Sequence, residues 1–488
     1  MKLQWNQIDW KRAEEQVNRL QMRIVKATLE QKWRLVKRLQ YLMTNSFYAK
    51  AVAVKRVVTN KGKKTPGIDG ETWKTDNEKA DAIRNLKCQT YHAKPLKRVY
   101  IEKFGKKEKR PLGIPTMGDR AMQALQLLAL EPVAETTADR ISFGFRRYRS
   151  PEDAREYAFS VLSRKDSPQW ILEGDIKSCF DKISHRWMLE NIPTDKRILK
   201  EFMKCGYIDK GKLFPTIEGS PQGGVISPTY ANMVLDGLEP MILNEYWRSK
   251  VKRTFSVKYN SHKVHVVRFA DDFIVTASDK ETLSEIKIMI EKFLELRGLT
   301  LSEEKTVITH INDGFDFLGW NFRKFKGKLI IKPSHKSMSK ITKKVSEVIK
   351  GNQTAKQEVL IRKLNEITVG WANYHHSACA KKSFSTIDHR IWEMLWKWSR
   401  RRHPNKSKHW IVNKYWKTHK GRKWTFMSDK NILFLMMDMP IVRKGQMSLD
   451  KNPFLNQEYF ENRTKKHRIN RKKAMCSNHA AQIKYYAL

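Results

Sequence analysis

Cysteine is scarce in this sequence, and no two cysteines lie close together. Five occur in 488 residues and no CxxC pair is present, the positions being Cys88, Cys179, Cys205, Cys379 and Cys476. This scatter argues against a disulfide framework and against a tetrahedral zinc site, because both need cysteines at close and regular spacing. The composition favours a protein of a reducing compartment.

Long apolar runs are also absent. No stretch approaches the length that spans a bilayer, and residues 1–5 lack both the apolar core of a signal peptide and the Arg- and Ser-rich character of a transit peptide. We therefore expect a soluble, intracellular protein of the cytoplasm with no membrane partner.

Acidic residues are the third shortage. Lys and Arg total 96 against 51 Asp and Glu, a formal net charge of +45. Residues 321–488 alone hold 39 Lys and Arg and 10 Asp and Glu, so about a third of the chain carries +29 of that charge. So large a charge is tolerated where a polyanion supplies the counter-charge or where the charges lie on well-solvated faces. Nucleic acid is the expected partner, bound through phosphate contacts that give little sequence choice.

The length and the hydrophobic pattern predict two or three domains. Residues 10–54 show helical periodicity with many Lys and Arg on the opposite face and no proline, which predicts a basic helical extension. A Gly, Pro and Lys cluster at 61–70 predicts either a loop that follows a phosphate backbone or a plain surface loop. Helical periodicity returns over 335–400, after which the chain becomes irregular and basic.

Two extended segments joined by a basic turn precede a buried helix. Residues 99–101 and 112–114 flank residues 104–110, which are rich in Lys and Arg, and such a tip suits contact with a triphosphate or a nucleic-acid backbone. Residues 119–134 then predict a mostly buried helix with Asp119 as its N-cap.

Two adjacent carboxylates occupy a predicted hairpin. Asp271 and Asp272 lie in RFADDFIV (268–275), where apolar and β-branched residues on both sides predict a strand, a tight turn and a returning strand. Adjacent aspartates repel each other and gain nothing from packing. A turn that holds them needs a cation, and oxygen ligands favour Mg²⁺.

Two-metal chemistry needs a third carboxylate. Asp175 ends an apolar segment, WILEGD, 96 residues before Asp271. Carboxylates on two neighbouring strands could bracket two metal ions about 4 Å apart, one activating a hydroxyl and the other stabilising a leaving oxygen. Asp181 competes for this role, but its sequence context, DKISH, is more typical of the start of a helix.

Between these acids lies GSPQGGVISP (219–228). Its paired glycines let backbone approach a ligand closely, and Gln222 offers both a donor and an acceptor. Alone, this sequence is a generic turn before a helix. In the order strand-end acid, SPQGG turn and ADD hairpin, however, the chain resembles the palm of a reverse transcriptase.

The resemblance covers most of the chain and is most specific to the group II intron reverse transcriptases of bacteria and organelles, also called maturases. It rests on further motifs in order, namely TPGIDG (65–70), RPLGIP (110–115), GFR with RS (144–146, 149–150), FLGW (317–320) and GWANY (370–374). The implied fold class is α+β, a right-hand polymerase with fingers, a palm with an antiparallel sheet, and a helical thumb. The implied domains are a basic helical extension at 1–60, fingers and palm at 61–330, a thumb or maturase X domain at 331–402, and a basic DNA-binding region at 403–488.

The resemblance assigns a catalytic centre residue by residue. Asp175, Asp271 and Asp272 are implied as ligands of two Mg²⁺ ions, for which Mn²⁺ can substitute, and the backbone carbonyl of Ile176 is implied as a further ligand. Phe180 resembles the aromatic gate under the sugar of the incoming nucleotide, and an ordinary core aromatic is the alternative.

Other residues are implied around the nucleotide and the primer. Lys97, Lys109 and Arg110 resemble the fingers residues that meet the triphosphate of a dNTP, and which of them does so is left open. Gln222 resembles the turn that supports the templating base pair. Lys305 resembles the acid that protonates pyrophosphate, with a surface lysine as the alternative. The implied primer grip is Phe317, Leu318, Gly319 and Trp320.

Contacts to RNA or DNA are implied along the basic loop, the N-terminal helices and the thumb-like region, through phosphates, 2′-hydroxyls and stacking. The candidate residues are Lys63, Lys64, Arg146, Arg149, Trp371, Tyr374, Arg401, Arg402, Trp416 and Trp424. Seven tryptophans lie between residues 371 and 424. Trp392 and Trp396 have the spacing of a helix core, whereas Trp410, Trp416 and Trp424 lie among lysines and are the better candidates for RNA contact.

The implied function is that of an RNA-directed DNA polymerase acting on an RNA template and a DNA primer. Such a protein also binds its group II intron RNA, assists splicing and copies the intron into target DNA during retrohoming, which would keep it near the bacterial nucleoid. Phe269 replaces the tyrosine common in this family and leaves both acids in place. Only Cys476 and His479 lie where many relatives have a Cys-rich HNH endonuclease, so we expect no endonuclease activity, and retrohoming that uses a nascent strand at a replication fork.

Two other functions remain open on the sequence. A domesticated reverse transcriptase in phage defence or in a CRISPR-associated system would share the palm, and a splicing-only maturase would bind RNA without polymerising. The sequence does not identify the intron or the DNA target, and it leaves a homodimer open.

Overall fold

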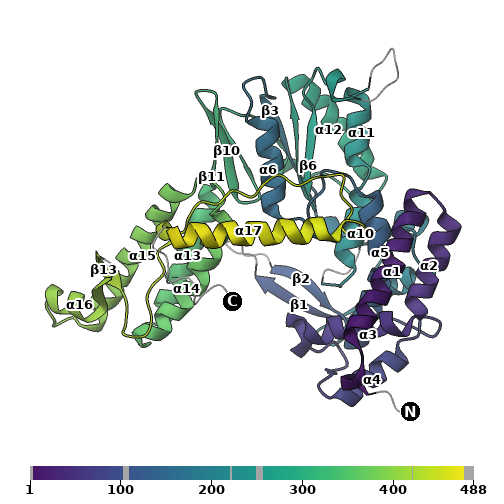
Figure 1. Cartoon of the computed structure of the whole chain (residues 1–488), viewed down its shortest axis with the longest axis horizontal. Helices are drawn as coiled ribbons and strands as arrows, with labels where there is room; N and C mark the ends of the chain where they lie inside the picture. The colour runs from purple at the N-terminus through teal and green to yellow at the C-terminus, as the bar shows by residue number, and fades with distance from the viewer. Residues whose placement is uncertain (1–3, 103–108, 220–222, 249–255, 420, 478–488) are drawn as a thin grey trace. The chain divides into compact units, whose positions relative to one another are not determined.

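The computed structural model describes residues 4–102, 109–219, 223–248, 256–419 and 421–477 (Figure 1). Its chain forms two compact units. The first comprises Met1–Ala154, Pro168–Ile308 and Met447–Phe460, and the second comprises Arg155–Ser167, Thr309–Gln446 and Glu461–Leu488. Within the described ranges, none of the helices combines the length and the apolarity needed to cross a bilayer.

The first unit begins with a layer of helices packed around one buried helix. These are α1 (Trp10–Leu29), α2 (Trp33–Asn45) and α3 (Phe47–Thr59), and all three contact α5 (Met117–Thr137) (Figure 1). The predicted helical extension over 10–54 is confirmed, but it is broken twice. Gln31 adopts a left-handed conformation with φ 55°, and Ser46 starts a new helix by accepting a hydrogen bond from the backbone N–H of Ala49.

The buried helix α5 begins two residues earlier than the sequence predicts. Its N-cap is Thr116, whose hydroxyl accepts the backbone N–H of Asp119. The Asp119 carboxylate accepts hydrogen bonds from the hydroxyls of Thr116 and Tyr91 instead of capping the helix. The N-cap prediction was therefore wrong, because either side chain suits a helix start and only the tertiary partner Tyr91 distinguishes them.

A small sheet carries the basic hairpin. Its strands are β1 (Leu96–Glu102), β2 (Lys109–Ile114), β4 (Tyr207–Asp209) and β5 (Lys212–Phe214), in the order β2-β1-β4-β5. β1 and β2 pair antiparallel from Lys97 opposite Ile114 to Glu102 opposite Lys109, which confirms the two predicted extended segments. The connecting residues 103–108 lie outside the described residues.

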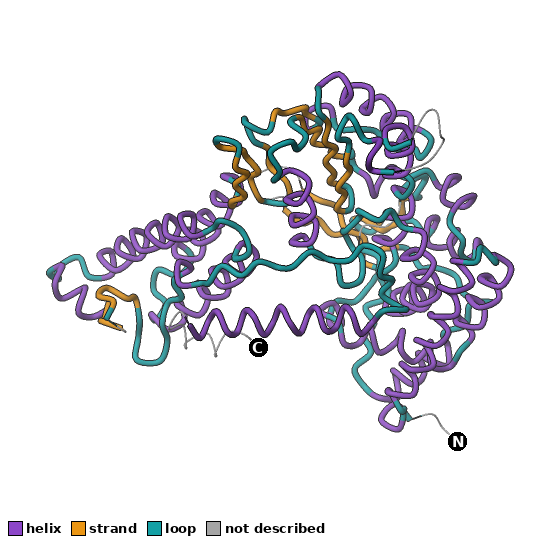
Figure 2. Tube along the Cα trace, turned by 45° about the horizontal axis from the view of Figure 1, so that its top comes forward, coloured by secondary structure: helices purple, strands orange, loops and turns teal. Residues whose placement is uncertain are grey.

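The central sheet of the first unit has the order β6-β7-β3-β8. Its strands are β3 (Trp170–Asp175), β6 (His265–Phe269), β7 (Asp272–Ala277) and β8 (Val307–His310), and β7 pairs antiparallel with both β3 and β6. Figure 2 shows these strands in orange among purple helices, and α12 (Lys280–Glu295) packs on β3 and β7. The strands are largely buried because Leu172, Phe273 and Val275 belong to the main apolar core.

Shorter elements complete the first unit. They are α4 (Asp76–Asn85), α7 (Cys179–Lys182), α8 (His185–Asn191), α9 (Lys196–Lys204), α10 (Ser227–Leu235), α11 (Leu238–Tyr246), and the 3-10 turns η1 (Trp5–Gln7), η2 (Lys61–Lys64), η3 (Val257–Tyr259) and η4 (Glu303–Lys305). Residues 447–460 return from the far end of the chain and pack on this unit. Phe460 stacks on Tyr148 at 5.0 Å, and the Arg147 guanidinium lies 4.8 Å from the Phe454 ring.

The second unit combines a three-stranded sheet with a helical bundle. The sheet has the order β11-β10-β9, from β9 (Phe315–Phe317), β10 (Trp320–Phe325) and β11 (Lys328–Pro333). The helices are α13 (His335–Lys350), α14 (Gln357–His375), α15 (Lys381–Arg402) and α16 (Lys408–Tyr415), which confirms the helical periodicity over 335–400. Their core includes Val345, Leu364 and Phe384.

The basic region after residue 404 is more ordered than the sequence predicts. It contains a hairpin of β12 (Trp416–His419) and β13 (Arg422–Phe426), the 3-10 turn η5 (Met436–Asp438) and the helix α17 (Gln457–Ser477). Two helices span the boundary between the units along the chain, α6 (Pro151–Leu162) and α17.

Candidate active site

Three carboxylates meet at one end of two paired strands. Asp175 ends β3 and lies opposite Asp272, the first residue of β7. Asp271 occupies the turn between β6 and β7, where Ala270 has a left-handed φ of 57° and Phe269 pairs with Asp272. The predicted strand, turn and strand are therefore present. Asp175 is paired with this hairpin through β3, whereas the competing Asp181 belongs to α7.

Glycine is required at two positions around this hairpin. A Cβ on Gly174 would lie 2.1 Å from Cζ of Phe273, so the Phe273 ring covers β3 directly before Asp175. A Cβ on Gly144 would lie 2.3 Å from the backbone N of Ala270. Both distances are far below van der Waals contact, so these glycines allow the approach that fixes the position of the turn.

The segment around Gly144 also supports the hairpin through its backbone. Arg268 donates its N–H to the carbonyl of Ile141 at 3.0 Å, and Phe143 donates to the carbonyl of Arg268 at 2.9 Å. Asn232 donates from its side chain to the carbonyl of Gly144 at 2.7 Å. The strand that leads into the carboxylates is thus held from the side by a second chain segment.

A buried ionic cluster, formed by Arg268, Asp139, Asp236 and Glu239, lies at the base of this arrangement. The Arg268 guanidinium pairs with Asp236 and lies 3.8 Å from Asp139, and the Arg268 side chain is 1% exposed. Burial raises the pKa of Asp236, and the charge of Arg268 acts in the opposite direction. Burial also raises the pKa of Glu239 to about 7, although Glu239 accepts the backbone N–H of Ile141 at 2.8 Å.

This cluster is not predicted by the sequence patterns described above. Its members come from three segments separated by about thirty to a hundred residues. The available signal was Arg268 itself, a charged residue within an otherwise apolar strand directly before the turn, because a buried arginine needs a carboxylate partner.

Cations approach the carboxylates from two elements. Burial raises the pKa of Asp271, the charge of Asp175 raises it further, and the charges of Arg110 and Lys305 act in the opposite direction. The Lys305 ammonium lies 2.5 Å from a carboxylate oxygen of Asp175. Arg110 is exposed in β2, and Lys305 belongs to η4, whose preceding residue Ser302 donates its N–H to the Asp175 carbonyl.

The carboxylate oxygens of Asp175, Asp271 and Asp272 are chemically suitable ligands for a divalent cation. Among the described residues, no group of three or more Asp, Glu, His or Cys side chains converges closely enough to hold a metal ion. Instead, one carboxylate oxygen of Asp175 accepts a hydrogen bond from the ammonium of Lys305. This ammonium neutralises the Asp175 charge, as a bound cation would. Since Asp271 is partly buried beside a second carboxylate, a cation at this point would relieve the charge repulsion, and hard oxygen ligands suit Mg²⁺ or Mn²⁺.

Phe180 lies near this centre, five residues after Asp175, in α7. It is partly buried and meets the ring of Phe145 edge-on at 6.4 Å. Lys97 in β1 and Lys109 in β2 are both exposed. Of the predicted cationic residues, Arg110 and Lys305 are the ones whose charges lower the pKa of Asp271.

Gln222 lies outside the described residues, but the glycines beside it are placed. A Cβ on Gly219 would lie 2.6 Å from the carbonyl of Asp181, and one on Gly223 would lie 2.8 Å from the carbonyl of Gly113 in β2. The N–H of Val225 donates to the side chain of Gln123 in α5 at 2.7 Å. The described residues on both sides of Gln222 therefore pack closely against α7, β2 and α5, and the glycines allow this approach.

The predicted primer grip forms the turn between β9 and β10 in the second unit. Leu318 and Gly319 have left-handed φ values of 50° and 81° and make the turn itself. Phe317 and Trp320 are buried, and Trp320 stacks on Tyr374 at 4.6 Å. Tyr374 also donates its hydroxyl to the Leu318 carbonyl at 2.8 Å, so only the two turn residues are available for a ligand.

Several predicted nucleic-acid contacts turn out to be packed inside the protein. Arg146 is buried, pairs with Glu135 at 2.8 Å and donates to three backbone carbonyls. Trp416 is 2% exposed and lies among aromatic rings. These two assignments are corrected, because a buried side chain cannot meet a phosphate or a base.

Arg149 and Trp371 also have internal partners. Arg149 donates to the carbonyls of Arg140 and Ser142, and burial lowers its pKa to about 9. The Trp371 indole N–H donates to Ser337 at 3.0 Å. Their partners give both residues a structural role.

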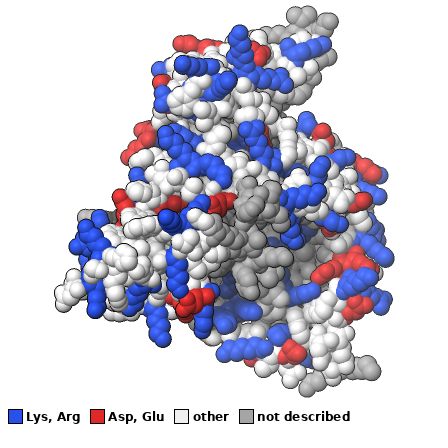
Figure 3. Space-filling model, turned by 60° about the vertical axis from the view of Figure 1, so that its left-hand side comes forward, with Lys and Arg blue, Asp and Glu red and all other residues white. Residues whose placement is uncertain are grey.

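Other predicted contacts do lie on the surface. Lys63, Lys64 and Arg401 are exposed, and Trp424 is 49% exposed. Lys and Arg side chains, blue in Figure 3, are more widespread than Asp and Glu over the face shown there. This surface suits a polyanion, and the sequence correctly indicated the charge without indicating which cations face outward.

Comparisons with known proteins match three regions. A family described as reverse transcriptase (RNA-dependent DNA polymerase) matches residues 101–322, and the N-terminal domain of reverse transcriptase matches residues 5–86. The group II intron, maturase-specific domain matches residues 338–416. The first match includes all three carboxylates, and the last includes α14, α15 and α16.

Individual relatives agree with these matches. The group II intron-encoded protein LtrA of Lactococcus lactis subsp. cremoris is 31% identical over 340 residues, which cover 58% of this chain and 56% of that protein. Protein YkfC of Escherichia coli is 33% identical over 319 residues, covering 58% of this chain and 82% of that protein. Maturase-like protein 1 of Euglena gracilis is 24% identical, and the match covers 75% of this chain and 76% of that protein. The match thus spans little more than half the length of LtrA.

Among solved structures, telomerase from Candida albicans in complex with a fragment of telomeric RNA has a TM-score of 0.37 and 14% identity, covering 67% of this chain and 61% of that one. Apo telomerase from Candida tropicalis has a TM-score of 0.36 and 15% identity, and the match covers 48% of this chain and 54% of that one. The assignment rests on the sequence families and on the relatives above. The chain belongs to the family of group II intron-encoded reverse transcriptases that carry a maturase-specific domain.

Proposed function

We propose that this protein is an RNA-directed DNA polymerase that extends a DNA primer on an RNA template. One observation carries the proposal. Asp175 lies opposite Asp272 across two paired strands, with Asp271 in the adjoining turn and with the charges of Arg110 and Lys305 directed at the same place. Carboxylates beside cations are the groups needed to transfer a nucleotide from a triphosphate.

The carboxylates would serve the attack of the primer on the α-phosphate of a dNTP. Asp175, Asp271 and Asp272, with the carbonyl of Ile176, would hold two divalent ions, Mg²⁺ or Mn²⁺, which supply activation of the 3′-hydroxyl and neutralisation of the triphosphate. The chain itself contributes the position of these oxygens. Gly174 and Gly144 fix the hairpin, and the buried cluster around Arg268 anchors the strand that leads into it.

The cationic side chains would act on the leaving group. Arg110 can form two parallel hydrogen bonds to the phosphates and stabilise the charge that develops on pyrophosphate. The Lys305 ammonium, which now donates to Asp175, would release it when substrate binds and donate a proton to a pyrophosphate oxygen. Phe180 would lie under the sugar and exclude a 2′-hydroxyl, for which its partly buried position near Asp175 is suitable.

We further propose that the protein binds its group II intron RNA, assists splicing and copies the intron into target DNA. The match of residues 338–416 to the maturase-specific domain supports this part, as does the net charge of the C-terminal third. We place this activity in the cytoplasm, at the nucleoid. Whether the protein acts as a homodimer is a matter for measurement of its mass in solution.

Primer extension with labelled dNTP tests the polymerase. Asp271→Asn keeps the shape of the side chain and removes its charge. We expect extension to fall by more than about 100-fold, since even loss of an outer partner of a metal ligand costs about 10- to 100-fold. Asp313→Asn, an exposed aspartate outside the site, serves as the matched control.

Two outcomes would contradict the assignment in different ways. Equal extension by wild type and Asp271→Asn would show that the site is wrong. No extension by wild type at any concentration of Mg²⁺ or Mn²⁺, with RNA binding retained, would favour a splicing-only maturase instead.

A further inference from the structure

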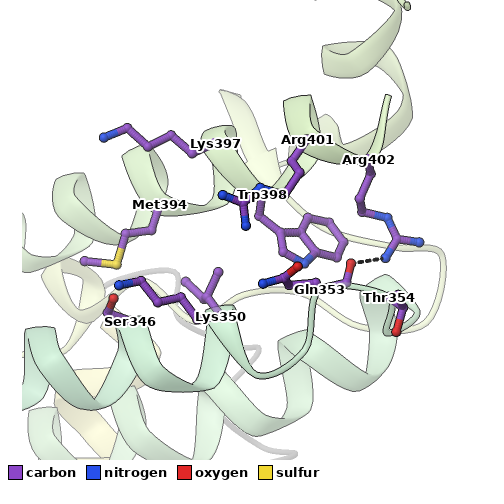
Figure 4. A pocket seen from close by; sticks show the side chains of 10 residues that line it. Ser346, Lys350, Gln353, Thr354, Met394, Lys397, Trp398, Arg401 and Arg402 are labelled. Carbon is purple, nitrogen blue, oxygen red and sulfur yellow. Dashed lines mark hydrogen bonds between the residues drawn. The ribbon is translucent and has the colours of Figure 1, made fainter. Parts of the chain in front are cut away.

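The second unit contains a pocket of about 350 Å³ between α13 and α15. Figure 4 shows side chains of the two helices facing each other across it, with the loop after α13 closing one end. The lining residues are Ser346, Ile349, Lys350, Gln353, Thr354, Met394, Lys397, Trp398, Arg401 and Arg402. Four of these ten carry a positive charge, and none carries a negative one.

Three of the four cations have no partner. Lys350, Lys397 and Arg401 are exposed, and none of them makes a side-chain hydrogen bond or an ion pair within the described part of the chain. Three unpaired cations around one concave surface repel one another and create a positive potential that favours an anion.

The fourth cation has a different role. Arg402 donates to the carbonyls of Gln353 and Ala355 at 2.8 and 2.9 Å, and its guanidinium lies 4.6 Å from the ring of Trp398. Trp398 in turn donates its indole N–H to the carbonyl of Asn352 at 3.0 Å. These bonds fasten the loop after α13 to the end of α15, so the wall of the pocket is built without a ligand.

A second concave surface lies on the other side of the same helix end. It also measures about 350 Å³ and is lined by Lys397, Arg400, Arg401, His403, Pro404, Lys406, Lys408 and Ile411. Lys397 and Arg401 line both pockets, and because they are four residues apart on α15 they form one ridge between the pockets.

We propose that a single strand of folded RNA crosses the ridge formed by Lys397 and Arg401, with one phosphate in each pocket. Lys350 and Arg401 would hold the phosphate in the first pocket, and the ribose would lie on the apolar floor of Ile349, Met394 and Trp398. The inference deepens the proposed function, on which it rests, by naming where the maturase-specific domain grips RNA.

Two features favour RNA in a single strand over duplex DNA. A pocket of this volume admits about one nucleotide and not the two strands of a duplex. The rim also offers the hydroxyls of Ser346 and Thr354 and the side-chain amide of Gln353, groups that can bond the 2′-hydroxyl that only RNA carries.

Binding of a labelled RNA hairpin with a long single-stranded loop, compared with a DNA hairpin of the same sequence, tests the proposal without nucleotides or primer. The variant is the triple substitution Lys350→Gln, Lys397→Gln, Arg401→Gln. The matched control is Lys344→Gln, Lys382→Gln, Arg390→Gln, which removes the same charges from exposed positions of the same helices outside the pocket.

We expect the pocket variant to bind the RNA hairpin roughly 10-fold more weakly or worse, since one hydrogen bond to a charged group is worth about that factor. The slope of log affinity against log salt should shrink by about 1.4, or about 0.7 for each phosphate of a single strand. The control should change either quantity much less. The double variant Ser346→Ala, Thr354→Val should lose part of the preference for RNA over DNA while keeping the salt slope.

Equal weakening by the pocket and control variants would overturn the proposal, as would equal loss on the RNA and DNA hairpins. Thermal unfolding of each variant shows whether the fold is kept. If wild type binds the RNA hairpin and the pocket variant binds it equally well, only this site is wrong. If wild type neither binds RNA nor extends a primer, the proposed function itself is wrong.

Discussion

The two units use the same kinds of charged residue in opposite ways. In the first unit, Arg268 is buried and faces the carboxylates of Asp236 and Asp139. In the second unit, Lys350, Lys397 and Arg401 are exposed and have no carboxylate partner among the described residues. A buried charge must be paired within the fold, whereas an exposed and unpaired one is available to a ligand. Arg268 therefore holds the hairpin that carries Asp271, whereas the exposed cations are available to the nucleic acid proposed above.

The largest effect that the comparison predicts is at Arg268. Arg268→Met should lower the free energy of unfolding by about 3–5 kcal/mol, because it leaves buried carboxylates without their partner. Urea unfolding monitored by circular dichroism measures this change. Primer extension should fall with it at temperatures where the variant is folded, because the strand that leads to Asp271 loses its anchor. A loss below about 1 kcal/mol would remove the distinction between the two kinds of cation.

A middle-sized effect is expected at Glu239, as a dependence of stability on pH. Burial raises the pKa of Glu239 from 4.5 to about 7, so the folded protein binds more protons than the unfolded chain between these values. Stability is therefore highest below pH 4.5 as far as this group is concerned, and it is lost as pH rises through 7. In Glu239→Gln, the free energy of unfolding should fall by about 1–3 kcal/mol less over this pH range than in wild type. Urea unfolding measures the free energy of unfolding of wild type and of Glu239→Gln at pH 5 and at pH 8. An equal change between the two pH values in both proteins would contradict the prediction.

The smallest effect is expected at Arg401, which is the counterpart of Arg268 on the second unit. Arg401→Met should change the free energy of unfolding by no more than about 0.5 kcal/mol, because an exposed and unpaired side chain contributes little to the folded state. A stabilisation would sharpen the comparison, since it would show that the cations around the pocket repel one another. A loss of several kcal/mol would show that Arg401 has a structural partner.

Much of the hairpin that carries Asp271 and Asp272 could be predicted from the sequence, because its signals are local. Asp271 and Asp272 stand between two apolar runs with strand character, and Asp175 ends a third, so strand ends and turn follow from a few consecutive residues. The helical unit was predictable for the same reason, since residues 335–400 repeat their apolar positions with the period of a helix.

The parts that escaped prediction depend on partners far along the chain. In the sequence, Arg146 resembles an exposed arginine, and the position of Arg268 in an apolar strand does not show which carboxylate it pairs with. The fold supplies these partners, Glu135 and Asp236. Trp416 lies among lysines, yet in β12 it points inward while its neighbour Lys417 points outward. Buried and exposed side chains alternate along a strand, but a strand of four residues is too short for this pattern to be recognised in the sequence.

The order in which the chain is made has a consequence for how the first unit is completed. This unit contains Met447–Phe460, whose Phe460 stacks on Tyr148 and whose Phe454 lies by Arg147. A ribosome must therefore synthesise the chain as far as residues 447–460 before the surface around residues 147–148 can be covered. Until then the surface around residues 147–148 is open to solvent and to chaperones, so a fragment that stops at residue 446 would carry an unfinished first unit although it contains Asp175, Asp271 and Asp272.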